Sequence, residues 1–162
     1  ASVTQFLEGV GVLIIEYETE LRSGGDTSTD NRYHAGNKRL HGSWCFPMTL
    51  GNIASGDMVT QFTPRFSGEI VRTHFVTTTV ASIASKAATL NLEIGAVDLS
   101  GGTVALTTAL CDTLGEVVEG AAIAGSNAFS DTDTISVEAS SVTTFSQGAG
   151  LLIVEYEGDV LG

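Results

Sequence analysis

The sequence predicts an all-β protein, an antiparallel two-sheet β-sandwich of about eight strands with a jelly-roll-like arrangement. Three observations carry this prediction. Short β-type runs, broken by Gly, Asn, Asp and Ser, follow one another from residue 45 to residue 157. Several of these runs alternate apolar and polar residues with period two, as in a strand with one buried face. No segment competes as a long amphipathic helix.

The predicted strands follow directly from the positions of the turn residues. Their ranges are 45–50, 57–63, 68–79, 87–96, 102–109, 114–123, 133–139, 141–145 and 149–157. Alternation predicts that Leu90 and Leu92 face the core in one strand, and Ile135 and Val137 in another. The LSGGT sequence at 99–103 is typical of a hairpin connection. Pro47 and Pro64 are expected at edge strands, because proline lacks a ladder donor.

The last predicted strand repeats a phrase from the start of the chain. Sliding the sequence by 139 positions aligns residues 1–20 (ASVTQFLEGVGVLIIEYETE) with residues 140–159 (SSVTTFSQGAGLLIVEYEGD), and 11 of the 20 pairs are identical. Each copy indicates two strands, with a G-x-G step that suits a tight bend, a bulge or a close backbone approach. In the C-terminal copy, Leu152, Val154 and Tyr156 form a face that stays apolar, while the other face ends in Glu155 and Glu157.

The N-terminal copy precedes the rest of the domain, so its apolar strand has to find a sheet elsewhere. Two interpretations stay open: residues 1–20 are the tail of an upstream copy of the domain, or they are strands lent to a neighbouring subunit by β-augmentation. On the second interpretation, the candidate interface residues combine this strand with cationic and aromatic residues that follow it. They are Val12, Leu13, Ile14, Ile15, Tyr17, Arg22, Arg32, Tyr33, Lys38 and Arg39.

Charge is unevenly divided along the chain, which has a net charge of −12. Residues 21–44 hold four basic and two acidic side chains without clear periodicity, and we expect an extended cationic arm there. Residues 45–162, the predicted sandwich domain, hold thirteen acidic and three basic side chains. This balance argues against nucleic acid and anionic membrane as direct partners. The arm is expected to lie on the acidic body of another subunit.

No pattern in the sequence indicates catalysis, a cofactor or a metal site. His34 and His41 fall in the arm and His74 falls in a predicted strand, where a solitary histidine is most simply a half-buried polar residue. The acidic pairs at 26–30 and 130–134 lack the ligand count and glycine of a calcium loop. The two cysteines, at 45 and 111, are expected to be buried free thiols. With no signal-peptide pattern and no stretch of membrane-spanning length, we expect a soluble chain made in a reducing compartment.

Residues 46–157 resemble a group of small structural proteins of tailed phages. The motifs that carry the resemblance are GD-x-V-T-x-F-T-P-x-F-x-G-x-I and F-x-x-x-D-T-I-S-V-E-A, which here read GDMVTQFTPRFSGEI and FSDTDTISVEA. The chain is similar to capsid decoration (cement) and head-fibre proteins. That resemblance implies a β-sandwich, often trimeric, on the outside of an icosahedral capsid at junctions between major capsid proteins. It implies no catalytic residues and does not extend to the arm.

The leading functional hypothesis is a non-enzymatic capsid decoration protein that clamps capsomers through strand and arm exchange. Its expected partners are the major capsid protein and further copies of itself, with a trimer favoured. Its expected location is the virion exterior, after assembly in the host cytoplasm. Two alternatives are an extracellular fibre or pilus-like subunit polymerised by strand donation, and a lectin-like receptor-binding module.

Overall fold

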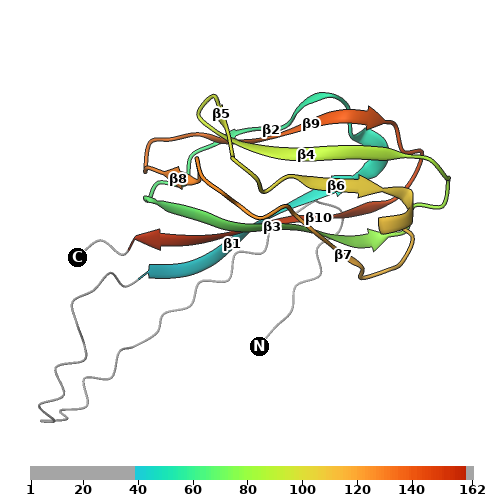
Figure 1. The fold of residues 1–162 in the computed structure, drawn as a ribbon, viewed down its shortest axis with the longest axis horizontal. Helices are drawn as coiled ribbons and strands as arrows, with labels where there is room; N and C mark the ends of the chain where they lie inside the picture. The colour runs from blue at the N-terminus through green and yellow to red at the C-terminus, as the bar shows by residue number, and fades with distance from the viewer. Residues whose placement is uncertain (1–38, 160–162) are drawn as a thin grey trace, which may run out of the picture. The chain divides into compact units, whose positions relative to one another are not determined.

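The computed structural model describes residues 39–159, which form two antiparallel five-stranded sheets stacked as two layers (Figure 1). Sheet A has the order β1-β10-β3-β7, with β8 also paired to β3, and sheet B has the order β2-β9-β4-β5, with β6 also paired to β4. Sheet A comprises β1 (Arg39–Thr49), β10 (Ala149–Asp159), β3 (Gly68–Thr79), β7 (Val117–Glu119) and β8 (Ala128–Phe129). Sheet B comprises β2 (Gly56–Phe62), β9 (Ile135–Thr143), β4 (Ala87–Ile94), β5 (Val97–Asp98) and β6 (Val104–Thr107). The predicted two-sheet antiparallel β-sandwich is therefore confirmed, whereas its jelly-roll character stays a prediction.

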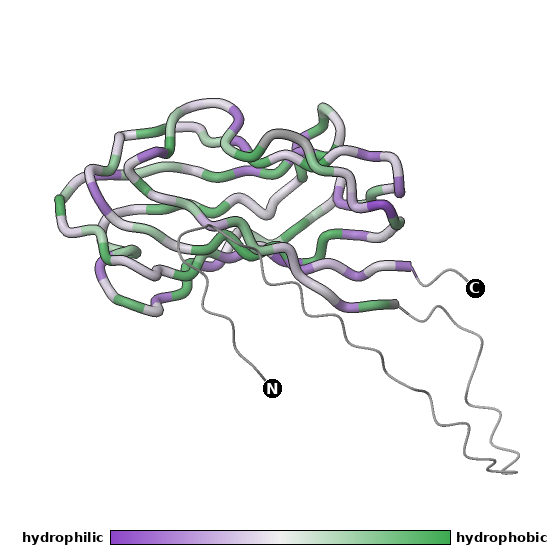
Figure 2. The backbone as a smooth tube through the Cα atoms, turned by 180° about the vertical axis from the view of Figure 1, so that it is seen from behind, coloured by the Kyte–Doolittle hydropathy of each residue, from purple (hydrophilic) through white to green (hydrophobic). Residues whose placement is uncertain are grey.

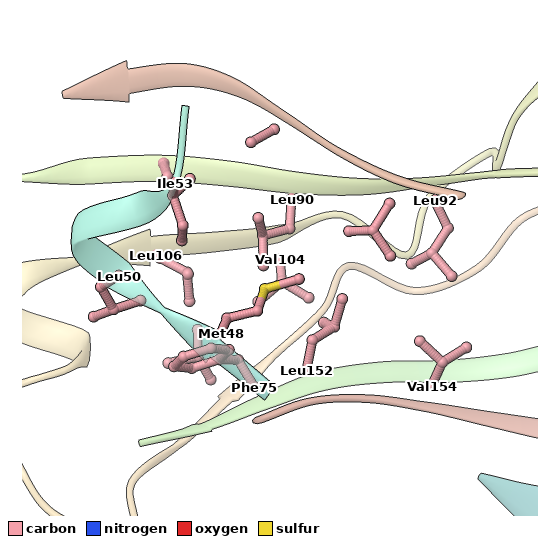
Figure 3. Close-up of a cluster of buried hydrophobic side chains, with 14 of the residues drawn as sticks. Met48, Leu50, Ile53, Phe75, Leu90, Leu92, Val104, Leu106, Leu152 and Val154 are labelled. Atoms are coloured by element: carbon pink, nitrogen blue, oxygen red, sulfur yellow. The ribbon is translucent and has the colours of Figure 1, made fainter. Parts of the chain in front are cut away.

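The core lies between the two sheets and is built from inward-facing residues of the longer strands (Figure 3). In β10, Leu152 and Val154 are fully buried, as their place on the apolar face of the repeat predicts. They face fully buried residues of sheet B such as Leu90, Leu92 and Val137. Burying each such side chain contributes about 1.5–3 kcal/mol, so the inner faces fix the register of both sheets.

Two short 3-10 helices close the sandwich at the end where the chain passes from β1 of sheet A to β2 of sheet B. They are η1 (Leu50–Asn52), which joins β1 to β2, and η2 (Thr108–Leu110), which follows β6. Leu50 in η1 is fully buried, and its amide donates to the carbonyl of Gly148 at the start of β10. The η1 turn therefore closes this end of the core and ties it to β10.

The glycines of the repeated phrase have the two roles that the sequence predicts. Gly148 has φ +107, a region that residues with a Cβ rarely adopt. Gly150 has no such φ, but a Cβ added there would lie 2.1 Å from Cζ of Phe75, a fully buried ring of β3. The first glycine makes the bend into β10, and the second lets the β10 backbone lie against the core.

The short strands β5 and β8 were not predicted, and the main differences in the predicted ranges concern β1, β9 and β7. Strand β1 begins at Arg39, so residues 39–44, assigned to the arm, belong to the sandwich. The runs 133–139 and 141–145 form one strand, β9, because Ser141 adopts φ +51 at a register shift against β4, and this bulge lets the ladder continue past it. The run 114–123 yields only the short strand β7.

The segment that follows β7 closes one long side of the sandwich. Gly120 donates its amide to the carbonyl of Thr73 in sheet A, and Ala121 donates to Thr103 beside β6. Further on, Ala124 donates to Ser100. Residues 120–123, predicted to end the strand 114–123, thus bridge the sheets instead of joining a ladder, and local sequence pattern does not distinguish the two outcomes.

The first and last described strands start and finish at one end of the sandwich. Arg39 pairs with Asp159 across β1 and β10, while Thr49 pairs with Ala149 at the opposite end (Figure 1). The strand pair predicted for residues 1–20 and the arm residues 21–38 lie outside the described residues.

Candidate functional site

The side of the sandwich opposite residues 120–127 is formed by the edge strands of the two sheets. Strand β1 is the edge of sheet A, and β2 is the edge of sheet B. Within residues 39–159, neither strand has a partner on its outer side. An unpaired edge offers backbone donors and acceptors that a further strand can use. This open side is therefore the part of the described fold that is best suited to strand addition.

A cluster of aromatic side chains fills the gap between the two edges, and we call Trp44, Phe46 and Phe62 the edge seam. The Trp44 and Phe62 ring centroids are 4.9 Å apart in an edge-on arrangement, and those of Phe46 and Phe62 are 5.6 Å apart. All three side chains are half-buried and pack against the core. Large aromatic side chains left half-covered beside an open edge are typical of surfaces that bind a partner.

Behind the seam, the aromatic cluster continues into the interior. Trp44 stacks on Tyr156 of β10 with ring centroids 4.4 Å apart, and Phe66 and Phe129 contact both rings. Burial among these rings raises the pKa of the Tyr156 hydroxyl above its usual value. These ring contacts anchor Trp44 to the core.

The two edges differ in regularity. Strand β1 pairs with β10 without a register shift over eleven consecutive residues, whereas β2 pairs with β9 with two irregularities. Bulges blunt an edge against further pairing, so β1 is the better acceptor. Pro47 lies within the regular part of β1, where its missing N–H is tolerated because that position points away from β10. Pro47 is thus on an edge strand, as predicted.

The outer face of sheet A carries the main ion-pair network of the described residues. Arg72 of β3 donates to Glu119 of β7 through Nε at 3.0 Å and to Glu155 of β10 through Nη1 at 2.8 Å. This pairing holds the pKa of Glu119 below its usual range. His74 lies beside the network, with Nδ1 3.6 Å from Oε1 of Glu155, and it is buried to a greater extent than the half-burial expected of it.

A second candidate surface lies at the end opposite Arg39, where we define the loop-end patch. It comprises the exposed apolar side chains of Val80, Ile83, Leu110, Leu114 and Val117. Val117 begins β7, and the other four residues lie in the segments after β3 and β6, which are joined by hydrogen bonds from the Ala81 amide to the Cys111 carbonyl and from the Thr108 hydroxyl to the Ile83 carbonyl. Figure 2 shows apolar residues recurring along these loops. Exposed apolar side chains at one end of a fold are a candidate surface for binding a partner.

Most of the candidate interface residues named from the sequence lie outside the described residues. They are Val12, Leu13, Ile14, Ile15, Tyr17, Arg22, Arg32, Tyr33 and Lys38, and their roles stay predictions. Arg39 is the first residue of β1 and belongs to the half of that strand that the sequence placed in the arm. Sequence reasoning missed the edge seam, because its aromatic residues come from separate strands and meet only in the folded sandwich.

The expectation of two buried free thiols is half right. Cys111 is a buried free thiol whose pKa is raised by burial. Cys45 is a free thiol too, but it is exposed, because it lies on the outward-facing side of β1 between the inward-facing Trp44 and Phe46. Strand alternation from Trp44 could have identified this.

The sequence predicts no metal site, yet three described carboxylates are placed to hold an ion. Asp57, Glu93 and Glu138 come from β2, β4 and β9, and each offers an oxygen within 4.8 Å of the others. Their separation along the chain hides the cluster from a search for local ligand spacing. It becomes visible once the strand order β2-β9-β4 is known.

Within the described residues, no helix is long and apolar enough to cross a membrane. No family model, curated protein or solved structure matches the chain.

Proposed function

We propose that the chain is a structural virion protein, a capsid decoration protein that binds the outside of a phage head and clamps capsomers by exchanging its N-terminal strand with a neighbouring copy. The single observation that carries the proposal is the asymmetry of the sandwich. One long side is closed by hydrogen bonds from residues 120–124, while the other presents the regular edge of β1 beside the half-buried edge seam.

The repeated phrase supplies a strand suited to this edge. Strand β10 already pairs with β1 in antiparallel register, with Leu152 opposite Phe46 and Val154 opposite Trp44. The N-terminal phrase GVGVLIIEYE has the same alternation as GAGLLIVEYE in β10. Added antiparallel to the outer edge of β1, it would place Leu13 and Ile15 on the inner side, over the edge seam.

The two ends of the sandwich suit a clamp. The described chain begins at the end where Arg39 pairs with Asp159, and the loop-end patch lies at the other end. Strand β3 alone has twelve residues, which at about 3.3 Å per residue span roughly 40 Å. A subunit tied to its neighbour along the edge of β1 and resting the loop-end patch on the shell would bridge adjacent capsomers, and symmetry would multiply these contacts into avidity.

A proline in β1 tests the strand exchange without unfolding the domain. Ser43 lies four residues before Pro47 and therefore directs its N–H to the same outer edge. Ser43→Pro should remove a donor that an incoming strand needs while leaving the β1–β10 ladder intact. Ser43→Ala, which keeps the N–H, is the matched control.

We expect the native chain and Ser43→Ala to form the same closed oligomer and to occupy capsids equally, as measured by analytical ultracentrifugation and by quantifying the protein on purified particles. Ser43→Pro and a chain lacking residues 1–18 should both give smaller species and reduced occupancy. Full occupancy and unchanged oligomer size in both variants would refute the proposal.

The alternative of a fibre polymerised by strand donation makes a different prediction for the same samples. Donation into a sheet requires an acceptor position without its own strand, and in the described residues β10 occupies the place that its copy would fill. This observation favours edge addition over replacement of β10. Open filaments in electron micrographs of the purified chain, in place of closed oligomers, would support the fibre subunit instead.

A further inference from the structure

The outer face of sheet B carries a group of carboxylates that no cationic side chain of the described residues compensates. Glu138 in β9 pairs across the sheet with Asp57 of β2 on one side and Asn91 of β4 on the other. Glu93 lies two residues along β4, opposite Asp98 of β5. The ion pairs of the described residues are made by Arg72, His41 and His74, and none reaches this group.

The three oxygens provided by Asp57, Glu93 and Glu138 have the spacing of ligands around one calcium ion. They lie within 4.8 Å of one another. Ca²⁺ binds oxygen at about 2.3–2.6 Å, so ligands on opposite sides of the ion are about 5 Å apart. Mg²⁺ requires distances of about 2.0–2.1 Å and nearly ideal octahedral geometry, and it fits this spacing less well.

An independent observation comes from Asn91, which lies beside Glu138 on the same face. Asn91 is 9% exposed, and its side-chain oxygen Oδ1 accepts no hydrogen bond. A buried carbonyl oxygen without a donor is destabilising, because it has lost its hydration and gained nothing. Every neighbour in the group offers acceptors when ionised, so a cation is the partner that satisfies this oxygen and the carboxylates together.

The surroundings also orient the ligands. Ser136 of β9 donates its hydroxyl to Oε2 of Glu93 at 3.0 Å, and this bond fixes the carboxylate over the sheet. Burial, followed by the carboxylates of Asp98, Glu93 and Asp57, raises the pKa of Glu138 despite a side-chain hydrogen bond with Asn91 that lowers it, and the ionised carboxylates repel one another. Such repulsion is the cost of holding the group together, and a divalent cation would reverse it.

We propose that this face binds one Ca²⁺ ion, held by the carboxylates of Asp57, Glu93 and Glu138 and by Oδ1 of Asn91, with water completing the shell. The ion links β2, β9 and β4. Because β2 pairs irregularly with β9, an ion attached to Asp57 holds this edge strand in the sheet. The site is independent of the proposed capsid role.

Calcium titration of the purified chain at constant ionic strength tests the site. Isothermal titration calorimetry with CaCl₂ should report one ion per chain. At a Ca²⁺ concentration ten times the dissociation constant, the melting temperature should rise by about 5 °C, and MgCl₂ should have a smaller effect. Constant ionic strength, kept with NaCl, removes the general screening of acidic surface charge.

Three variants separate ligation from electrostatics. Glu138→Gln should abolish the calcium-dependent rise, although the ion-free variant should remain folded because the substitution relieves repulsion. Asn91→Leu keeps every carboxylate and should lower the affinity by about tenfold, the lower end of the loss typical when a group supporting a metal site is removed. Asp131→Asn removes one exposed charge from a loop elsewhere and should respond as the native chain does.

The proposal is overturned if CaCl₂ leaves the melting temperature of the native chain unchanged. It is also overturned if Glu138→Gln or Asn91→Leu keeps the full native response, since the effect would then arise from charge in general and not from these ligands.

Discussion

Replacing Gly150 with alanine should destabilise the sandwich severely, and the structure gives the reason. The new Cβ would lie 2.1 Å from Cζ and 2.4 Å from Cε1 of Phe75, and 2.5 Å from the carbonyl oxygen of Val76. Ordinary contacts between such atoms are about 3.5–4.0 Å. The Phe75 ring or the β10 backbone must therefore move by more than about 1 Å.

Neither movement is easy. Phe75 is fully buried in the middle of the core, and Val76 belongs to the strand that pairs with β10 (Figure 3). Overpacking a core usually costs about 1–3 kcal/mol, and we expect Gly150→Ala to reach about 3 kcal/mol because the backbone and a core ring are both displaced. For a domain of this size that loss lowers the melting temperature by roughly 10 °C.

Urea unfolding followed by the fluorescence of Trp44, the sole tryptophan of the chain, measures the effect. Gly125→Ala is the matched control: its φ is not positive, and the nearest atom to an added Cβ is 4.0 Å away. That variant should be neutral or slightly more stable, because alanine restricts the unfolded chain. A Gly150→Ala variant within about 0.5 kcal/mol of the native chain would show that β10 does not lie against Phe75 as described here.

Two further predictions concern side chains whose chemistry depends on the fold. Cys45 should react with a thiol reagent at neutral pH in the native protein, whereas Cys111, buried and with a raised pKa, should react only after unfolding; equal reaction rates would contradict the assigned faces of β1. The Arg72 pair lowers the folded-state pKa of Glu119, so its stabilisation is present above the unfolded pKa of about 4.5 and is lost as the pH falls through the lowered value. Glu119→Gln should therefore be less stable than the native chain in urea at pH 7 and equal to it near pH 2, and a difference that persists in acid would assign the effect to packing.

The sequence was sufficient to predict the fold class and the faces of several strands, because both follow from period-two alternation. Leu152 and Val154 face the core as predicted, and the G-x-G step has the bend and the close approach expected of it. These features depend on residues that are close together in the chain, or on a repeat that makes their pattern easy to recognise.

The rest depends on which strands become neighbours, and alternation carries no information about that. The edge seam joins residues of β1 and β2, and the acidic group joins β2, β9 and β4. The segment 120–123 was predicted to continue a strand, but it bridges the sheets, because the carbonyl oxygens of Thr73 and Thr103 accept hydrogen bonds from Gly120 and Ala121. Each of these three features depends on pairing between residues that are far apart in the chain.

The strand order also separates the two interpretations of the N-terminal repeat. The N-terminal copy has the same residues as β10 at positions that face inward, such as Gly150 and Tyr156. It also has the same residues at positions that face outward, such as Glu155 and Glu157, so the residues of both faces are repeated. A strand that repeats the residues of both faces of β10 is suited to a position in a sandwich sheet, with a partner strand along its edge.

If residues 1–20 belonged to the sheet of an upstream domain, the repeated strand would not pair with the edge of β1. Ser43→Pro would then leave the oligomer unchanged, while deletion of residues 1–18 would alter it. If a neighbouring copy supplies the place, both changes should have the same effect, because each removes one half of a single β1 pairing. Comparing the two variants by native mass spectrometry therefore tests where the repeated strand binds, and a discordant result would assign it to a sheet other than the one described here.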